Sequence, residues 1–268
     1  MKPTVKNRLS VLRRDFRETA DFLRRRARRR QAAEELQKQS SPQELFQFTQ
    51  QRFVRPAAQN ESEIVRFVNA IADLRPRVVC EIGVQDGGTT FILSRALPTL
   101  DMMIAIDLHV SLKCQLRYFR RPDLRLRLID GPSLSLRTLR RVERILGGQR
   151  LDVLFIDGDH SYEGALGDFL AYRPFVRDGG VIAFHDIVLD SQTRHGIKSE
   201  AYVGDVPRLW ADLAPHYRSK EFIDDPGQDG CGIGMLLYDV SVALPELVPH
   251  PRSLSARARS RKRRSQAS

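Results

Sequence analysis

Acidic and imidazole side chains follow two apolar segments in the second half of the chain. The run LFIDGDH places Asp157, Asp159 and His160 directly after a stretch typical of a buried strand. In the run IAFHDI, His185 and Asp186 likewise follow an apolar stretch. A turn at a strand end needs only an Asp-Gly pair. Carboxylates gathered at one place repel each other unless a proton or a cation joins them. These residue types therefore predict a site for acid–base chemistry or for a divalent metal.

The elements that must position these residues alternate along the chain from about residue 42. Short apolar runs predict strands, and the amphipathic stretches between them predict helices. Such alternation is typical of βαβ units in a doubly wound, mostly parallel α/β sheet with helices on both faces. The last two strands have a short connection and are expected to form an antiparallel hairpin. The expected strands are residues 77–83, 102–108, 124–130, 151–157, 179–187, 220–224 and 232–240, and the expected helices are residues 42–53, 60–74, 89–97, 135–148, 161–176 and 206–217.

Ligands of a doubly wound sheet bind beyond the carboxyl ends of its strands. The first strand ends in EIGVQDGGTT, where Gly83 and Gly87 follow Glu81 and allow a tight turn close to a ligand. This loop is neither a dinucleotide fingerprint nor a lysine-containing phosphate loop, and its acids disfavour a polyphosphate. Asp107 ends the second strand, where an acid is placed for a ribose diol, and Asp130 ends the third. The three strand ends together predict a ligand with hydroxyl groups and a positive centre.

These strand ends resemble those of the class I S-adenosylmethionine-dependent methyltransferases. The runs ELFQFTQQRF, EIG…GGTTFILSRAL, LDVLFIDGDHSYEGALGDFLAYRPFVRDGGVIAFHDIV, VPRLW and GIGMLLY further resemble a bacterial group related to cephalosporin hydroxylase-like and sugar O-methyltransferases. The resemblance covers about residues 42–240. It implies a Rossmann-like fold and S-adenosyl-L-methionine as cofactor, with the glycine loop around its amino-acid part, Asp107 at the ribose and Asp130 beside the adenine. The expected cofactor-binding residues are Glu81, Gly83, Gln85, Gly87, Asp107, Asp130 and Asp157.

The same resemblance makes the fourth and fifth strands neighbours, so that the two acidic segments face each other across one strand spacing of about 4.8 Å. Related metal-dependent O-methyltransferases carry acids at these strand ends, which match Asp157 and Asp186. We expect both to bind a divalent metal, in the first instance Mg²⁺, with Asp159 or His185 completing the site. An imidazole ligand would favour Mn²⁺ or another transition metal. The next position, which is polar in those enzymes, is Ile187 here.

The expected reaction is methyl transfer to a hydroxyl group of a small molecule or sugar. A hydroxyl is a poor nucleophile until it loses its proton, and a chelating metal lowers its pKa. His160 is the first candidate for the catalytic base, because the ordinary histidine pKa lies near neutrality, and His185 is the second. Asp159 alone is equally well explained as the cap of the following helix. Residues 187–205 are too long for a simple connection and predict either a lid over the substrate or a surface loop.

Basic residues are concentrated at the two ends of the chain. The net charge is +11, but residues 1–40 hold 13 Lys and Arg against 5 Asp and Glu, and residues 251–268 hold 7 Lys and Arg and no acid. Residues 41–250 therefore carry a net charge of −4, which argues against a basic nucleic-acid groove on the folded part. We expect a basic, helical or frayed arm over 1–40, a methyltransferase domain over 41–245 and a disordered basic tail over 246–268.

Three cysteines without a paired spacing argue against a disulfide framework or a zinc ribbon, and the sequence has no run of about 20 apolar residues that could span a membrane. A cytoplasmic protein is expected, with basic ends that can reach anionic lipid or nucleic acid. Formation of a homo-oligomer stays open. Two other functions stay open as well: an RNA methyltransferase that uses the basic ends, and a non-catalytic cofactor-binding or tethering protein. An iron-dependent oxygenase is the weakest alternative, because no distinct set of two histidines and one carboxylate stands out.

Overall fold

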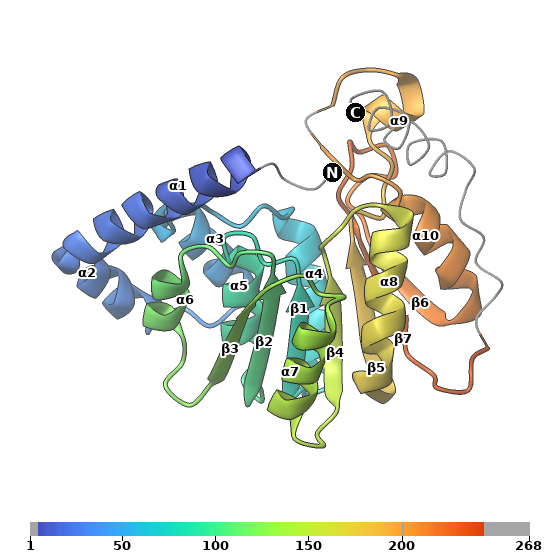
Figure 1. The fold of residues 1–268 in the computed structure, drawn as a ribbon, viewed down its shortest axis with the longest axis horizontal. Coiled ribbons are helices and arrows are strands. Elements are labelled where there is room, and N and C mark those ends of the chain that lie inside the picture. The colour runs from blue at the N-terminus through green and yellow to red at the C-terminus, as the bar shows by residue number, and fades with distance from the viewer. Residues whose placement is uncertain (1–4, 200, 244–268) are drawn as a thin grey trace, which may run out of the picture.

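A seven-stranded sheet forms the centre of the protein (Figure 1). The structure is a computed structural model and describes residues 5–199 and 201–243. The strand order is β3-β2-β1-β4-β5-β7-β6; β1 to β5 are parallel, and β7 runs antiparallel to both of its neighbours. This confirms the predicted doubly wound, mostly parallel sheet with a C-terminal antiparallel hairpin. The strands are β1 Val78–Ile82, β2 Met102–Asp107, β3 Arg125–Asp130, β4 Leu151–Ile156, β5 Val176–His185, β6 Arg218–Phe222 and β7 Ile233–Leu237.

Helices cover both faces of the sheet because its strands are apolar on both sides. Successive side chains of a strand point to opposite faces, so β1 contributes Val79 to one core and Cys80 to the other. The first core is closed by α3 (Pro42–Arg52), α4 (Glu61–Ala72) and α5 (Gly88–Ala96). The second is closed by α7 (Leu136–Leu146), α8 (Tyr162–Tyr172) and α10 (Val206–Leu213), and Trp210 of α10 is buried in it.

Four short helical segments lie between these elements: α6 (Lys113–Phe119), α9 (Ser191–His195) and the 3₁₀ turns Arg173–Phe175 and Ala214–His216. The helices α6 and α9 were not predicted. Helices of five to seven residues are too short to form without tertiary contacts, so the sequence carries little periodic signal for them. The α9 helix lies inside residues 187–205, the segment expected to be a lid or a surface loop.

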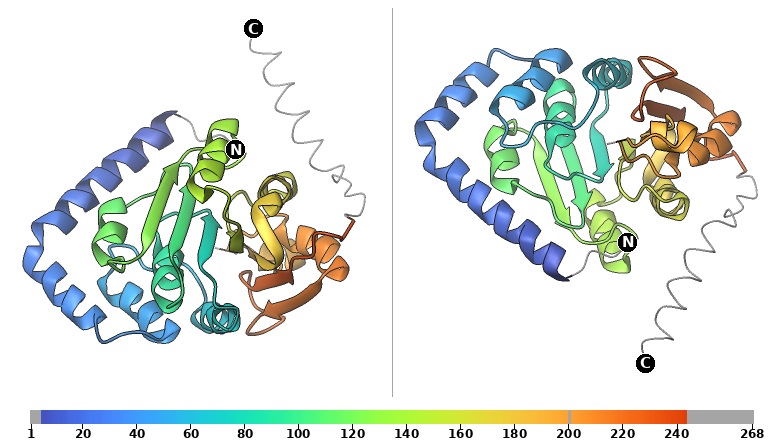
Figure 2. Two further views of the ribbon diagram at one scale, coloured as in Figure 1. Left: turned by 90° about the horizontal axis from the view of Figure 1, so that it is seen from below. Right: turned by 90° about the horizontal axis from the view of Figure 1, so that it is seen from above.

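Two helices of the basic N-terminal arm pack beside the β3 end of the sheet, opposite β6 and α10 (Figures 1 and 2). They are α1 (Val5–Arg24) and α2 (Arg26–Leu36). Phe22 is 6% exposed, and its ring meets that of Phe119 edge-on with centroids 6.0 Å apart. The inner face of the arm therefore joins the core, while its outer face is solvated. No helix of the described chain is both long and apolar enough to cross a bilayer. Residues 1–4 of the arm and the predicted tail 246–268 lie outside the described residues.

Candidate active site at the carboxyl ends of the strands

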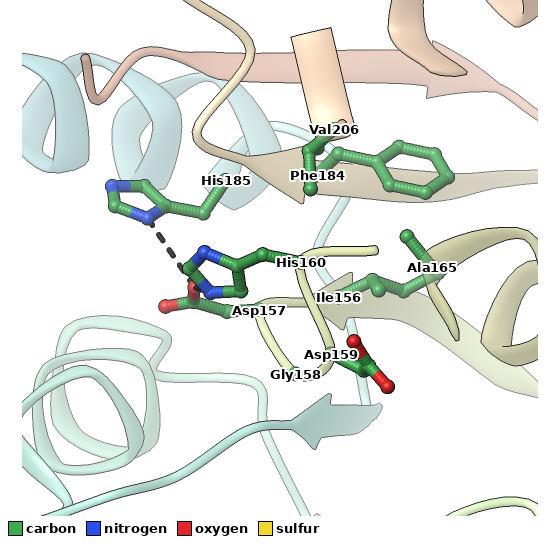
Figure 3. A pocket seen from close by; sticks show the side chains of 9 residues that line it. All are labelled: Ile156, Asp157, Gly158, Asp159, His160, Ala165, Phe184, His185 and Val206. Atoms are coloured by element: carbon green, nitrogen blue, oxygen red, sulfur yellow. Dashed lines mark ion pairs between the residues drawn. The ribbon is translucent and has the colours of Figure 1, made fainter. Parts of the chain in front are cut away.

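Asp157 and His185 meet where β4 and β5 end. The register pairs Ile156 with Phe184, so the next side chains emerge together at one edge of the sheet. Oδ1 of Asp157 lies 3.3 Å from Nδ1 of His185 (Figure 3). Gln59 donates from Nε2 to the other oxygen of Asp157 at 3.1 Å. The sequence did not predict this contact, because it joins residues 98 positions apart and Gln59 lies in an ordinary polar connection.

Asp186 links the two histidines. Nδ1 of His160 lies 3.2 Å from Oδ2 of Asp186, and Nδ1 of His185 lies 3.3 Å from Oδ1. Asp186 is 7% exposed, and its φ of 63° falls in the left-handed region that few residues other than glycine adopt. Strain of this kind persists where the surrounding structure enforces it, often at functional sites. Asp157, His160, His185 and Asp186 thus form one cluster, as predicted from the two strand ends.

Asp159 is the one predicted ligand that the structure does not bring to this cluster. Its side chain is exposed and points away from Asp157 and His160 (Figure 3). Oδ1 of Asp159 accepts a hydrogen bond from the backbone N–H of Ser161 at 3.0 Å, and its carboxyl group packs against Gly164. Ser161 is the N-cap of α8. Asp159 therefore supports the start of this helix through Ser161, but it is not the cap itself, as the alternative interpretation of the sequence had it.

His160 is held by the segment that follows β5. Its Nδ1 lies within hydrogen-bond distance of the carbonyl oxygen of Tyr202, and the two rings stack with centroids 5.5 Å apart. The backbone N–H of Asp205 donates to the carbonyl oxygen of His160 at 2.8 Å. Because Nδ1 faces two acceptors, the Tyr202 carbonyl and Asp186, it carries the proton in the neutral ring. The other nitrogen, Nε2, is then free to accept one, and it lies 3.7 Å from Oδ1 of Asp157.

His185 has a different electrostatic environment. Burial lowers the pKa of this imidazole, but the carboxylates of Asp157 and Asp186 outweigh burial and raise the pKa well above its ordinary value. A protonated His185 offsets part of the negative charge of its two neighbours. A histidine that already holds a proton is a poor general base, so the geometry favours His160 of the two candidates.

The glycine loop after β1 comes close to β4. Gly83 has a φ of +87°, and a Cβ atom there would lie 1.8 Å from the carbonyl oxygen of Asp157. Gly87 has a φ of +85°, and a Cβ atom there would overlap the side chain of Leu116. Gln85 between them also has a positive φ, of 48°. The turn therefore needs glycine at positions 83 and 87. It leads directly into the start of α5.

Asp107 holds the same loop from β2. Its Oδ2 accepts hydrogen bonds from the backbone N–H groups of Val84 and Gln85, both at 2.9 Å. Its Oδ1 accepts one from the backbone N–H of His109, also at 2.9 Å. An ionised carboxylate offers about four acceptor positions, so one stays free for a ligand hydroxyl. Asp107 therefore orders the glycine loop in addition to lying where the ribose is expected.

Asp130 lies beside Asp107 across the β2–β3 register. Its Oδ1 accepts from the backbone N–H of Val110 at 3.0 Å, and its Oδ2 pairs with Nζ of Lys113, a partner that the sequence did not indicate. Burial raises the pKa of Asp130, but the hydrogen bonds from Lys113 and Val110 outweigh it and leave the pKa below its ordinary value. Asp130 is thus ionised at the edge where the adenine is expected.

Glu81 lies inside β1 and is fully buried. Burial, and then the negative charges of Asp157 and Asp107, raise its pKa well above the ordinary value, although a hydrogen bond from Thr90 acts in the opposite direction. Oε1 of Glu81 has no hydrogen-bond partner among the described residues. Unpaired buried oxygens are rare in folded proteins, and a bound ligand is one way to satisfy them. The residues around the glycine loop therefore fit a ligand with donor groups.

The cluster at β4 and β5 fits a divalent cation. Donor atoms of Asp157, His160 and Asp186 lie within 4.8 Å of one another, and so do those of His185, Asp186 and Cys231. Carboxylate and imidazole groups are usual ligands of divalent metals. A small pocket adjoins the cluster and is lined by both polar and apolar residues (Figure 3). It is lined by Ile156, Asp157, Gly158, Asp159, His160, Ala165, Phe184, His185 and Val206.

Comparison with known proteins agrees with this arrangement. Residues 80–187 match a family described as a methyltransferase domain. The structure resembles an O-methyltransferase from Bacillus cereus solved with SAH, with a TM-score of 0.54 and 17% identity over 75% of this chain and 91% of that one. It also resembles the O-methyltransferase TomG from Streptomyces achromogenes, involved in tomaymycin synthesis and solved with SAM, with a TM-score of 0.51 and 18% identity over 75% of this chain and 90% of that one.

A curated relative matches only a short stretch. It is the uncharacterized protein R132 of Acanthamoeba polyphaga mimivirus, which is 50% identical over 36 residues, or 13% of this chain and 16% of that protein. So short a match carries no functional information. The matched residues 80–187 include the glycine loop after β1 and the ends of the neighbouring strands β4 and β5. Residues 80–187 therefore resemble a methyltransferase domain, and the chain has the doubly wound, Rossmann-like fold of the O-methyltransferases that it resembles, as predicted.

Proposed function

We propose that this protein is an S-adenosylmethionine-dependent O-methyltransferase that acts on a hydroxyl group of a small molecule or sugar with the help of a divalent cation. The observation that carries the proposal is the placement of His160. Its Nδ1 faces Asp186 and the Tyr202 carbonyl, which leaves Nε2 free as a proton acceptor beside the pocket. A base in this position serves transfer to a hydroxyl, which must lose its proton to react.

The cofactor would supply the electrophilic methyl group, and the residues around the glycine loop would hold it. Asp107 has one acceptor position left for a ribose hydroxyl. The unpaired Oε1 of Glu81 is available to a donor on the amino-acid part. Gly83 and Gly87 let the backbone approach without side-chain overlap, and Gln85 is carried on the turn between them. Together they form a site for a ligand with hydroxyl and ammonium groups.

The cation would be held by Asp157 and Asp186, which have carboxylate oxygens within 4.8 Å of each other. Such an ion lowers the pKa of a bound hydroxyl and orients it, and Mg²⁺ is our first candidate because carboxylates are its usual protein ligands. The protein residues have separate tasks. Asp186 and the Tyr202 carbonyl orient the ring of His160, Nε2 of His160 takes the proton, and Gln59 fixes the carboxylate of Asp157.

A small acceptor fits the surroundings of the cluster better than a nucleic acid. Residues 41–250 carry a net negative charge of −4, which repels a phosphate backbone. The residues that line the small pocket include the apolar Phe184 and Val206. Tyr202, in the segment that follows β5, packs on His160 and can limit access of bulk water to the pocket.

The test combines cofactor binding with turnover. S-adenosylmethionine is titrated calorimetrically into chelator-treated protein with and without Mg²⁺, and methyl transfer is then measured on a panel of catechols and sugars. We expect His160→Gln to bind the cofactor as the wild type does but to lower kcat by about 10²–10⁴-fold. His195→Gln, which changes an exposed histidine of α9, is the matched control and should leave kcat unchanged. If the cofactor bound neither with nor without Mg²⁺, the proposal would be overturned.

A further inference from the structure

The two carboxylate oxygens of Asp186 face two different groups. Oδ2 lies 3.2 Å from Nδ1 of His160. Oδ1 lies 3.3 Å from Nδ1 of His185. His185 and Asp186 are 6% and 7% exposed, so the second group is the more deeply buried of the two. Cys231 belongs to this second group, because its Sγ lies within 4.8 Å of the donor atoms of His185 and Asp186.

The backbone holds Cys231 against the end of β5. Cys231 has a φ of 60°, and its neighbours Gly230 and Gly232 have φ values of 79° and 84°. The carbonyl oxygen of Cys231 accepts from the backbone N–H of Val188 at 3.0 Å, and that of Gly232 accepts from Ile187 at 3.4 Å. Glycine adopts such angles readily, so Cys231 is the strained residue of the three, and a strained non-glycine residue needs a structural reason. Here the turn places the thiol beside His185, the last residue of β5, and Asp186, which follows it.

The donor set of this second group differs in kind from the first. Thiolate sulfur is a soft ligand that Mg²⁺ does not take and that Zn²⁺ and related borderline metals prefer. Nε2 of His185 is buried and has no hydrogen-bond partner among the described residues, so it is the ring nitrogen left for a metal ion, which would displace the proton that this histidine otherwise holds. One sulfur, one imidazole and one carboxylate provide three protein ligands, the number found in many zinc sites with an open position.

We propose that His185, Asp186 and Cys231 bind a Zn²⁺-class ion, at a site additional to the one proposed for Asp157 and Asp186. Asp186 is the shared residue and contributes one oxygen to each site. A carboxylate between two cations is a familiar arrangement in sites with paired metals. The proposal goes beyond the methyltransferase reaction, since it requires neither cofactor nor acceptor to be bound.

The test is a titration of the full-length, untagged protein with Co²⁺, which replaces Zn²⁺ and reports on its own ligands. Thiolate bound to Co²⁺ gives an intense sulfur-to-metal charge-transfer absorption in the near ultraviolet. We expect this absorption in the wild-type protein, its loss on addition of Zn²⁺, and no effect of millimolar Mg²⁺. Cys231→Ser should abolish the absorption and raise the Kd for Co²⁺ by about tenfold or more, since even residues that only support a ligand cost that much.

Two controls separate loss of the ligand from loss of the fold. Cys114→Ser removes the other partly exposed cysteine and should leave the absorption unchanged. Cys231→Gly removes the thiol while suiting the left-handed backbone, so it should fold at least as well as the serine variant and also lack the absorption. Absorption that is missing from the wild type, or that persists in both Cys231 variants, would overturn the proposal. S-adenosylmethionine titrated into the same samples tests the methyltransferase function independently.

Discussion

Asp15 of helix α1 and His109, which follows strand β2, lie 3.1 Å apart between Oδ2 and Nε2, although 94 positions separate them in the chain. Oδ1 of Asp15 also accepts a hydrogen bond from the backbone N–H of Leu112 at 2.7 Å. Both partners lie in the loop that begins after Asp107, where the ribose of the cofactor is expected. Helix α1 therefore stabilises the loop after β2, which belongs to the proposed cofactor site.

A second contact of α1 reaches the glycine loop. Glu18 pairs with Arg55 at 2.5 Å, and Arg55 in turn pairs with Asp86 of the run EIGVQDGGTT. Arg55 and Asp86 are both largely buried, so the pair is less screened by solvent than an ordinary surface ion pair. Helix α1 thus contacts the two loops that flank the expected cofactor.

Removal of the Asp15 carboxylate is expected to weaken cofactor binding. Asp15→Ala frees the loop after β2, and ordering it again on binding should lower the affinity for S-adenosylmethionine by about tenfold, equivalent to about 1.4 kcal/mol. The measurement is calorimetric titration. Asp21→Ala is the matched control, because within the described part of the chain Asp21 forms an ion pair with the exposed Arg25 of the same arm, and it should bind the cofactor as the wild type does. Equal affinities in all three proteins would show that α1 does not support the site.

Alanine substitutions at two glycines with nearly the same φ allow the cost of steric overlap to be separated from the cost of backbone strain. Gly83 has a φ of +87° and no room for a Cβ atom, whereas Gly148 has a φ of +88° and no neighbour within 4 Å. Gly148→Ala should lower the free energy of unfolding by about 1–2 kcal/mol, the cost of a left-handed alanine. Gly83→Ala should cost several kcal/mol more and abolish cofactor binding, because the overlap is with the backbone of Asp157. Urea unfolding of the two variants gives the difference, and equal losses would contradict it.

Stability should depend on pH through Asp168 of α8. This carboxyl group is 1% exposed, and its Oδ1 has no hydrogen-bond partner among the described residues. Burial raises its pKa from 3.8 to about 6. As pH rises from 4 to 6 the unfolded chain releases this proton while the folded chain keeps it, so the folded state loses stability across this window and stays less stable above it.

The expected loss is about 3 kcal/mol, because each pKa unit corresponds to about 1.4 kcal/mol. Asp168→Asn keeps the shape and removes the charge. Relative to the wild type, its free energy of unfolding should therefore increase between pH 4.5 and pH 7.5. Unfolding by urea at both pH values measures this, with Asp73→Asn as the control for removal of an exposed aspartate. A difference between Asp168→Asn and wild type that does not change with pH would rule out the buried acid as the source.

The outer face of α1 is the part of the basic arm that is available to a partner. Phe16 is 75% exposed, and Leu12 and Leu23 on the same face are 49% and 51% exposed. Basic residues flank this stripe, which suits adsorption to an anionic bilayer. We expect binding to vesicles with phosphatidylserine, measured by sedimentation, and a decrease of severalfold in Phe16→Glu. Leu136→Glu, at a site 71% exposed on α7, is the control and should bind as the wild type does. Equal binding of both variants would argue for a partner elsewhere.

Much of the fold followed from the sequence because its signals are local. The apolar runs that became β1, β2, β4 and β5 each ended in Gly, Asp or His, and periodicity separated them from the helices. In a parallel sheet these ends share one edge, so strand order alone brought Asp157 next to His185. The short helix α6 escaped prediction because its stability comes from packing, as with Phe119 in the first core.

The sequence by itself determined which residues reach the carboxyl edge of the sheet, because strand ends and turns are encoded by neighbouring residues. Only the tertiary structure decided where their side chains point. It turned Asp159 toward α8, placed Asp186 between two imidazoles, brought Cys231 to the end of β5 and fastened Asp15 to the loop after β2. These arrangements come from contacts between distant segments and from backbone angles enforced by packing, and neither leaves a periodic signal in the chain.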